Sequence, residues 1–206
     1  MYFQNLRRRT PDRKTTVSRS GDPLITFEQA AVFLRSVRAQ DNDAIGNAIL
    51  SIQRNIELYA GIRIDSGVFD AYFSEVANEF DIRDIPATVT NVYEIGWNGV
   101  ERELTAGTDY AVWQGPSPTV RFLPDYLAYF TRLATDDYLT PMGYRVRYNA
   151  GHTDVADVTP QVRLALEHEL AFYFKNRQDG DQQQIVISGE LTVQAKNLLD
   201  PIRLRK

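Results

Sequence analysis

Residues 144–177 constrain the fold more than any other stretch, because a clear strand is followed within a few residues by a clear helix. In the strand, Val146 and Tyr148 alternate with Arg145 and Arg147. This period of two is typical of a strand with one buried face and one exposed face. A glycine ends the strand and a polar loop follows it. The segment therefore predicts a sheet with one apolar side.

A helix is predicted over residues 159–177. Thr159 offers an N-cap hydroxyl, and Pro160 occupies the first helical position, where a missing N–H group costs nothing. Apolar residues then recur at spacings of three and four, so that one face of the helix can be buried. These residues are Val162, Ala165, Leu166, Leu170 and Tyr173.

Two further helices are predicted near the N-terminus, over residues 26–39 and 43–60. Thr26 and Gln29 form a capping box at the start of the first helix, and Gly61 supplies a C-terminal stop for the second. Both segments carry apolar residues at helical spacing, and a short polar turn joins them. They are expected to form an antiparallel helical hairpin with facing apolar stripes.

Residues 85–150 change to a period of two and predict a β-rich insertion. Asn98 and Gly99 form the strongest two-residue hairpin signal in the chain. Residues 110–113 and 119–123 are predicted to be further strands. Together with the strand that begins near residue 144, these segments predict a small antiparallel sheet.

Two aromatic segments are harder to assign. Residues 64–84 are expected to contain one short amphipathic helix. Residues 123–141 are expected to form a long loop that carries Tyr126, Tyr129 and Phe130. Long loops in compact domains are usually functional or bound to a partner. The three aromatic side chains are therefore expected either to pack on the protein's own sheet or to form an inter-subunit loop.

The predicted fold class is α+β: an antiparallel helical hairpin or bundle and a long helix of the C-terminal half, packed with a small antiparallel β-sheet. With 206 residues, of which 43% are hydrophobic, the chain can hold one domain of ordinary core size. This domain is expected over residues 22–190, between an N-terminal arm at 1–21 and a C-terminal arm at 191–206. Residues 185–187 and 191–193 are predicted to pair as strands.

Both ends of the chain are basic. Residues 1–20 carry a balance of +5 and residues 191–206 a balance of +3, which leaves −12 for the part between them because the whole chain is −4. The ends are expected to seek acidic partners, and the body is expected to repel nucleic acid. For the N-terminal arm three alternatives stand: a solvated tail, an arm that orders on a neighbouring subunit or a partner protein, and a nucleic-acid arm. The basic residues in question are Arg7, Arg8, Arg9, Arg13 and Lys14.

The sequence predicts a protein that is not an enzyme. It has no cysteine and two histidines, which excludes thiolate chemistry and leaves too few side chains for a histidine-built metal centre. Glu167, His168 and Glu169 are consecutive on a helix and point in different directions, and Asp136 with Asp137 is expected to be a solvated turn. The sequence contains no phosphate loop and no nucleophile elbow. No cofactor or metal is expected.

No membrane association is expected either. No apolar run approaches the roughly 20 residues that a membrane span needs, and residues 1–20 lack the apolar segment of a secretory signal. The protein is therefore expected to be soluble and to be made in the cytoplasm.

Three groups of residues carry a resemblance to a known family, the head-tail connector (adaptor) proteins of tailed bacteriophages. The first group lies in the strand and helix described above: Val146, Tyr148, Ala150, Gly151, Pro160, Tyr173 or alternatively Phe174, Asn176 and Arg177. The second lies in the two N-terminal helices and their turn: Thr26, Leu34, Arg35, Asp41, Asp43, Ile45, Tyr59, Gly61 and Arg63. The third resembles the C-terminal pattern of the family: Leu198, Leu199, Pro201 and Arg203, with Ile202 in place of a tyrosine.

This resemblance implies a structural role. Connectors of this family form a twelve-fold homo-oligomeric ring by side-to-side packing of their helical part, between the portal protein and the next neck or tail protein. The genome passes through the ring, so that DNA is cargo only. The location implied is the virion neck, at the head-tail interface. The C-terminal segment of the family grips the portal, and the resemblance assigns this role to Leu198, Leu199, Pro201, Ile202 and Arg203. Their apolar side chains are then expected to become buried only on assembly.

Two other functions compete with this one. The first is a DNA-binding module that acts through the basic N-terminal arm, although no recognition helix or basic strand platform is visible in the sequence. The second is another neck protein, such as a tail completion factor.

Overall fold

A computed structural model describes residues 8–20, 23–34, 42–74, 77–115, 117–133, 142–178 and 190–203. The chain divides into two compact units, and each of them is made of two separate segments. Unit 1 comprises Met1–Arg19 and Ser66–Gly151, and unit 2 comprises Ser20–Asp65 and His152–Lys206. This division differs from the predicted single domain over 22–190, because the β-rich segment has a hydrophobic core of its own.

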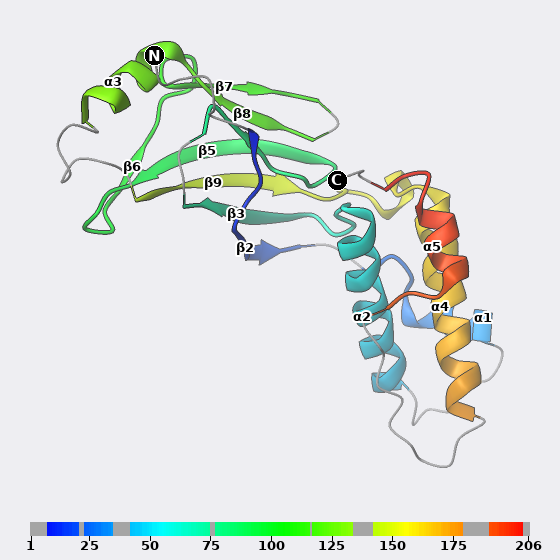
Figure 1. Ribbon diagram of the computed structural model, residues 1–206. Coiled ribbons are helices and arrows are strands. Elements are labelled where there is room, and N and C mark those ends of the chain that lie inside the picture. Colours follow the sequence, from blue (N-terminus) through cyan, green and yellow to red (C-terminus); the bar gives the residue numbers. More distant parts are fainter. Residues whose placement is uncertain are drawn as a thin grey trace. The chain divides into compact units, whose positions relative to one another are not determined.

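The larger sheet of unit 1 has five strands in the order β2-β3-β9-β5-β6 (Figure 1). All neighbouring strands in it are antiparallel. The central strand β9 is the one predicted from alternation, and its Tyr144, Val146 and Tyr148 are fully buried. The strands are β2 (Arg13–Arg19), β3 (Gly67–Phe73), β9 (Gly143–Ala150), β5 (Ala87–Ile95) and β6 (Glu101–Glu103).

The smaller sheet of unit 1 has four strands in the order β1-β4-β8-β7. Strand β1 pairs with β4 in parallel, and the other pairs are antiparallel. Its aromatic side chains Phe80 and Phe122 lie 5.3 and 5.1 Å from the ring of Tyr144 in the larger sheet, so the two sheets share one core. The elements are β1 (Arg8–Arg9), β4 (Glu79–Asp81), β8 (Thr119–Phe122) and β7 (Tyr110–Trp113), followed by helix α3 (Pro124–Leu133).

Unit 2 is helical. Its core is built from the apolar stripes of α2 and α4, with α1 and α5 packed against them. Both expected signals at helix ends are present: Gln29 N donates to Thr26 Oγ1 at 3.2 Å, and Gly61, at φ +71°, donates to the Glu57 carbonyl. The helices are α1 (Phe27–Leu34), α2 (Asn42–Ala60), α4 (Pro160–Gln178) and α5 (Val193–Leu199), with a short 3-10 helix at Val155–Asp157.

The α+β class is therefore confirmed, and α4 begins and ends within one residue of its predicted bounds. Residues 35–41, which would connect α1 to α2, lie outside the described residues, so the hairpin arrangement stays a prediction. In the described parts of the chain, no helix is both long enough and apolar enough to span a membrane.

Three local predictions were wrong. Residues 67–73 and 79–81 are strands and not a helix, because Phe69, Ala71 and Phe73 alternate and fill the core of unit 1. Residues 124–133 form helix α3 and not a loop; residues 134–141 lie outside the description. Residue 193 begins helix α5, capped by Thr192, and is not in a strand; the predicted strand at 185–187 also lies outside the described residues.

Candidate functional site

The C-terminal segment is folded onto unit 2. Helix α5 packs along α4 (Figure 1), and Leu199 is fully buried while Leu198 and Ile202 are partly buried against the same core. Glu169 fixes the start of the helix, since its Oε1 accepts hydrogen bonds from the Thr192 backbone N at 2.6 Å and from Thr192 Oγ1 at 2.5 Å. The segment is therefore part of the helical core.

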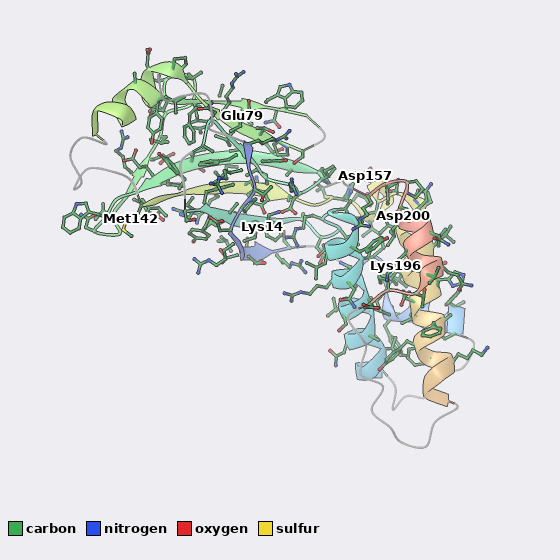
Figure 2. All side chains as sticks on the ribbon, in the orientation of Figure 1. Lys14, Glu79, Met142, Asp157, Lys196 and Asp200 are labelled. Carbon is green, nitrogen blue, oxygen red and sulfur yellow. The ribbon has the colours of Figure 1, made fainter. Side chains whose placement is uncertain are left out.

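The residues after α5 are also held in place. Asp200, labelled in Figure 2, accepts a hydrogen bond of 2.7 Å from the Tyr59 hydroxyl of α2, and this bond raises the pKa of Tyr59. The Arg203 guanidinium lies 4.3 Å from the centre of the Tyr59 ring. Pro201 and Arg203 are exposed.

These positions correct one expectation. The apolar side chains of the C-terminal segment were expected to become buried only on assembly, and for Leu199 this is wrong. The reason is the helix itself: Ala195 and Leu199 are four residues apart, so they lie on one face and both face α4 and α2. Of the five residues assigned to the portal grip, Pro201 and Arg203 present the most surface.

The N-terminal arm is also folded, as part of unit 1. Arg8 lies 3.1 Å from the Asp81 carboxylate, and its guanidinium donates to Thr119 Oγ1 at 2.9 Å. Lys14, labelled in Figure 2, extends from β2 to the carboxylate of Asp84 at 2.9 Å. The prediction of a solvated tail is therefore wrong for residues 8–20, and Arg7 lies outside the described residues.

One of these basic side chains packs on the neighbouring strand, and another residue pairs through its backbone. Arg13 lies over the ring of Tyr72 on the neighbouring strand, 4.4 Å from its centre. Arg9 belongs to β1, which pairs with β4.

Strand β2 runs so close to β3 that a Cβ atom at Gly67 would lie 2.6 Å from the Ser18 carbonyl oxygen. A glycine is therefore required at the position where the two strands meet.

A charged cluster on the larger sheet was not foreseen from the sequence. Asp70 on β3 accepts two hydrogen bonds from Arg147, at 2.8 and 2.9 Å, and lies 3.3 Å from Arg145. Arg145 also donates to Glu101 on β6, with Nε 2.7 Å from Oε1, and lies over the ring of Tyr93. Burial alone would raise the pKa of Asp70, but the bonds and charges of the two arginines outweigh it and lower that pKa.

The same cluster also shifts the pKa values of Glu101 and Arg145. The hydrogen bond from Arg145 lowers the pKa of Glu101, and the bond to Glu101 in turn raises the pKa of Arg145. All of the partners are satisfied within the protein, and Asp70 is only 4% exposed. The cluster therefore ties β6 to β9 and stabilises the sheet.

Tyr126 is a core residue. It lies on α3, is 4% exposed, and its hydroxyl is 2.7 Å from Glu94 and 3.1 Å from the Tyr144 hydroxyl. Burial raises its pKa well above the ordinary value. Of the two alternatives for the aromatic segment, packing on the protein's own sheet is confirmed for this residue. The side chains of Tyr129 and Phe130 lie outside the described part of the structure.

The outer faces of the unit 2 helices carry exposed apolar side chains. Leu50 and Leu58 lie two turns apart on α2, and Leu164 and Phe172 lie two turns apart on α4. Leu50 also lines a cleft of about 490 Å³ between α2 and the residues that lead into α1. The remaining lining residues are Pro23, Ile25, Phe27, Gly46, Asn47 and Ile49.

The acidic groups tested for catalysis do not converge. Glu169 is buried and bonded to Thr192, while His168 is exposed and Glu167 pairs with Arg163 along the helix. Asp136 and Asp137 lie outside the described residues. Within the described ranges no group of three or more His, Cys, Asp or Glu side chains could hold a metal ion.

Comparison with known proteins gives a consistent result at the level of the fold. No protein-family model matches the chain, and no curated protein matches its sequence. The chain is similar to chains in solved structures of gene transfer agent (GTA) particles. One comes from the neck of an empty GTA particle computed with C6 symmetry, with a TM-score of 0.66 at 15% identity.

Two more solved structures of gene transfer agent particles contain a chain with a similar fold. A chain in the virion of a native gene transfer agent particle has a TM-score of 0.66 at 16% identity. In both of these matches the similarity covers 94% of this chain and 96% of the other. A chain in the neck of a native GTA particle computed with C12 symmetry has a TM-score of 0.55 at 16% identity, covering 92% of this chain and 97% of the other. The protein therefore shares its complete fold, both units included, with chains of phage-like particles.

Proposed function

We propose that this protein is a structural subunit of the neck of a phage or phage-like particle. The observation that carries the proposal is the likeness in fold to chains from GTA necks over more than nine-tenths of both chains. A match that includes both units is more specific than a shared helical bundle would be, because bundles recur in unrelated proteins. The protein acts by assembly, without catalysis and without a cofactor.

Within the neck, the role proposed is that of the head-tail connector (adaptor), a ring of copies that docks on the portal protein and joins the capsid to the next neck or tail protein. Three separate motif groups of the sequence support this finer assignment. The C6 and C12 symmetry of the similar necks is compatible with a ring of copies, and twelve is the number that the sequence resemblance implies. The particle's DNA passes through the ring as cargo.

The helical unit offers a surface for ring formation. Exposed apolar side chains lie on two of its helices, Leu50 and Leu58 on α2 and Leu164 and Phe172 on α4. Two different surfaces that bind each other produce a head-to-tail contact, which closes into a ring when the rotation allows. Leu58 and Phe172 are 72% and 53% exposed, and we propose that contact between neighbouring copies buries them.

The proposed portal contact is narrower than the sequence suggested. Leu199 is committed to the core, so the C-terminal segment would present its exposed residues Pro201 and Arg203 from a firmly packed helix. A surface that is already ordered loses less conformational entropy on binding than a flexible arm does.

The competing functions have less support. A DNA-binding arm would need basic groups turned outward, but Arg8 and Lys14 form ion pairs with Asp81 and Asp84 inside unit 1. A tail completion factor remains the alternative among neck proteins.

Electron microscopy of the purified protein, alone and mixed with portal-bearing capsids, tests the proposal. We expect rings, and we expect them to attach to the portal vertex. Replacing Arg203 by Glu should reduce attachment, while the matched change at Arg163, which is exposed on α4, should not. A protein that never associates with portal-bearing capsids but binds to tail ends would support the tail completion role and overturn the adaptor role.

A further inference from the structure

We propose that unit 1 forms a second contact between copies of this chain, in which the β2 edge of the larger sheet meets the β6 edge of the same sheet in the next copy. The inference rests on the proposed ring and adds to it an interface outside the helical unit. The partner is a second copy of the chain, and four observations support this choice.

The first observation is the position of the two strands. Among the described residues, β2 and β6 are the outermost strands of the five-stranded sheet. An outermost strand directs main-chain N–H and C=O groups outward, where another strand can pair with them. The residues of β6, Glu101–Glu103, are all exposed, and so are most of those in β2.

The second observation is the charge of the two edges. Strand β2 has the sequence RKTTVSR, with three basic residues and no acidic one. Strand β6 has the sequence ERE and a net charge of −1. The edges are therefore complementary to each other, whereas each edge would repel a second copy of itself. This favours a contact between unlike edges over a symmetric dimer.

The third observation is a row of side chains that crosses the polar face of the sheet. The strand register places Arg13, Tyr72, Arg145, Tyr93 and Glu103 side by side, one from each strand. The two arginines lie over the tyrosine rings at 4.4 and 4.0 Å. The row is cationic at the β2 end and anionic at the β6 end. In an edge-to-edge contact, the anionic end of one copy meets the cationic end of the next.

The fourth observation is strand direction. Four successive antiparallel pairings separate β2 from β6, so the two edge strands run in the same direction. In a twelve-fold ring, neighbouring copies differ by a rotation of about 30°, so the direction of a strand changes by at most about 30° from copy to copy. The two edge strands would therefore meet in a parallel pairing.

Disulfide cross-linking tests the contact directly, because the chain has no cysteine of its own. Asp12 and Arg102 are exposed and directly precede Arg13 and Glu103, so the proposed parallel pairing sets them opposite each other. A variant carrying both Asp12→Cys and Arg102→Cys should give a ladder of covalent oligomers on a non-reducing denaturing gel after oxidation. Each single variant should give no ladder. A matched control combines Asp12→Cys with Arg121→Cys, since Arg121 is exposed on β8, an interior strand of the other sheet.

Charge reversal gives a second readout. Glu103→Arg should weaken self-association in sedimentation velocity roughly tenfold, and Arg13→Glu should do the same, because each change replaces an attraction by a repulsion. The double reversal should restore association. Glu103→Gln is the control for the hydrogen bond that Glu103 accepts from Asn91. The circular dichroism of each variant checks that unit 1 stays folded.

The outcomes separate this inference from the proposed function. A ladder confined to the Asp12–Arg102 pair, with association restored by the double reversal, supports the edge contact. Rings that form without this ladder overturn the edge contact and leave the neck function intact. A chain that forms neither rings nor a ladder at millimolar concentration, and does not attach to portal-bearing capsids, overturns both.

Discussion

Leu199 distinguishes a C-terminal segment that belongs to the core from one that serves only a partner. Its side chain is completely buried in unit 2. We expect Leu199→Ala to lower the free energy of unfolding of unit 2 by about 2–5 kcal/mol, the usual range for a leucine truncated in a packed core. Chemical denaturation followed by the helical circular dichroism signal measures this change.

Leu58→Ala is the matched control for that experiment. It is the same substitution in a helix of the same unit, but Leu58 is 72% exposed. We expect a change within about 0.5 kcal/mol, as for surface substitutions in general. Equal effects at the two positions would contradict the packing of α5.

Asp70 should make the stability of unit 1 depend on pH in the acid range. Its pKa in the folded protein is lowered, so its contribution is fully present above the ordinary carboxyl pKa of 3.8 and is lost as the pH falls through the lower, folded value. Asp70→Asn should destabilise unit 1 at neutral pH by about 3 kcal/mol, because it removes the shared partner of Arg145 and Arg147.

Thermal melts between neutral and strongly acidic pH check this prediction. The variant should show a flatter loss of stability below the ordinary carboxyl pKa than the unchanged protein does. Glu101 contributes in the same direction, since its pKa is lowered too, so some pH dependence will remain in the variant. An unchanged pH profile would count against the ion cluster.

For individual residues, the sequence predicted which side chains of a strand face the core better than it predicted which side chains contact each other. Alternation correctly separated Val146 and Tyr148 from Arg145 and Arg147. It could not reveal that both arginines reach Asp70, because that residue lies about 75 positions earlier in the chain and the register of a long-range strand pair is not encoded locally.

Strand β2 is the element whose role changed most between sequence and structure. It pairs along β3 and lies at the edge of the sheet. We expect removal of residues 1–19 to lower the midpoint of thermal unfolding of unit 1 by at least roughly 10 °C, since the loss of several hydrogen bonds and ion pairs amounts to a few kcal/mol.

The two tryptophans make the thermal unfolding of unit 1 measurable separately from that of unit 2. Trp97 and Trp113 are the only ones in the chain, and both belong to unit 1. Near-ultraviolet circular dichroism therefore reports on unit 1, while the helical signal reports mainly on unit 2. A truncated chain whose tryptophan signal melted at the original midpoint would show that β2 is dispensable.

Elements with several agreeing signals were predicted well. The sequence of helix α4 has a threonine at the capping position, a proline at the first helical position and a long apolar stripe, and each of these signals independently favours the same helix. Strand β3 and helix α3 were missed because short aromatic segments fit either period, and only the core that they fill decides between them. Helix α5 was missed because its seven residues give too little periodicity.

The two units should respond separately to a mutation in one core. Ile52 is 2% exposed and lies in the core of unit 2. Replacing it by Asp should unfold unit 2, because an unpaired buried carboxylate costs several kcal/mol, which is comparable to the total stability of a domain. The tryptophan transition of unit 1 should remain. Loss of both signals in one transition would mean that the units fold as one.

The distribution of charge over the molecule also differs from the one that the sequence suggested. The basic N-terminal segment belongs to unit 1, which has 12 basic and 13 acidic side chains and a balance of −1. Unit 2 has a balance of −3. Each of the two units is therefore nearly neutral. Repulsion of DNA can no longer be argued from a body with a net charge of −12.

Duplex DNA should nevertheless bind poorly at physiological salt. Non-specific affinity requires several basic groups that can neutralise phosphates, and Arg8 and Lys14 already pair with carboxylates. A gel-shift assay should show no complex at sub-micromolar protein. Tight binding that disappears on removal of residues 1–19 would contradict this and restore the DNA-binding alternative.

The chain passes between its two units three times, after Arg19, after Asp65 and after Gly151. On the ribosome, strand β2 is therefore complete long before its partner β3, which begins at Gly67. At roughly 5–20 residues per second, several seconds separate the two. Helices α1 and α2 must likewise wait for α4 before their apolar stripes are covered. Neither unit can finish folding early in synthesis. The nascent chain therefore exposes an unpaired strand and uncovered apolar helix faces while other copies are being synthesised nearby.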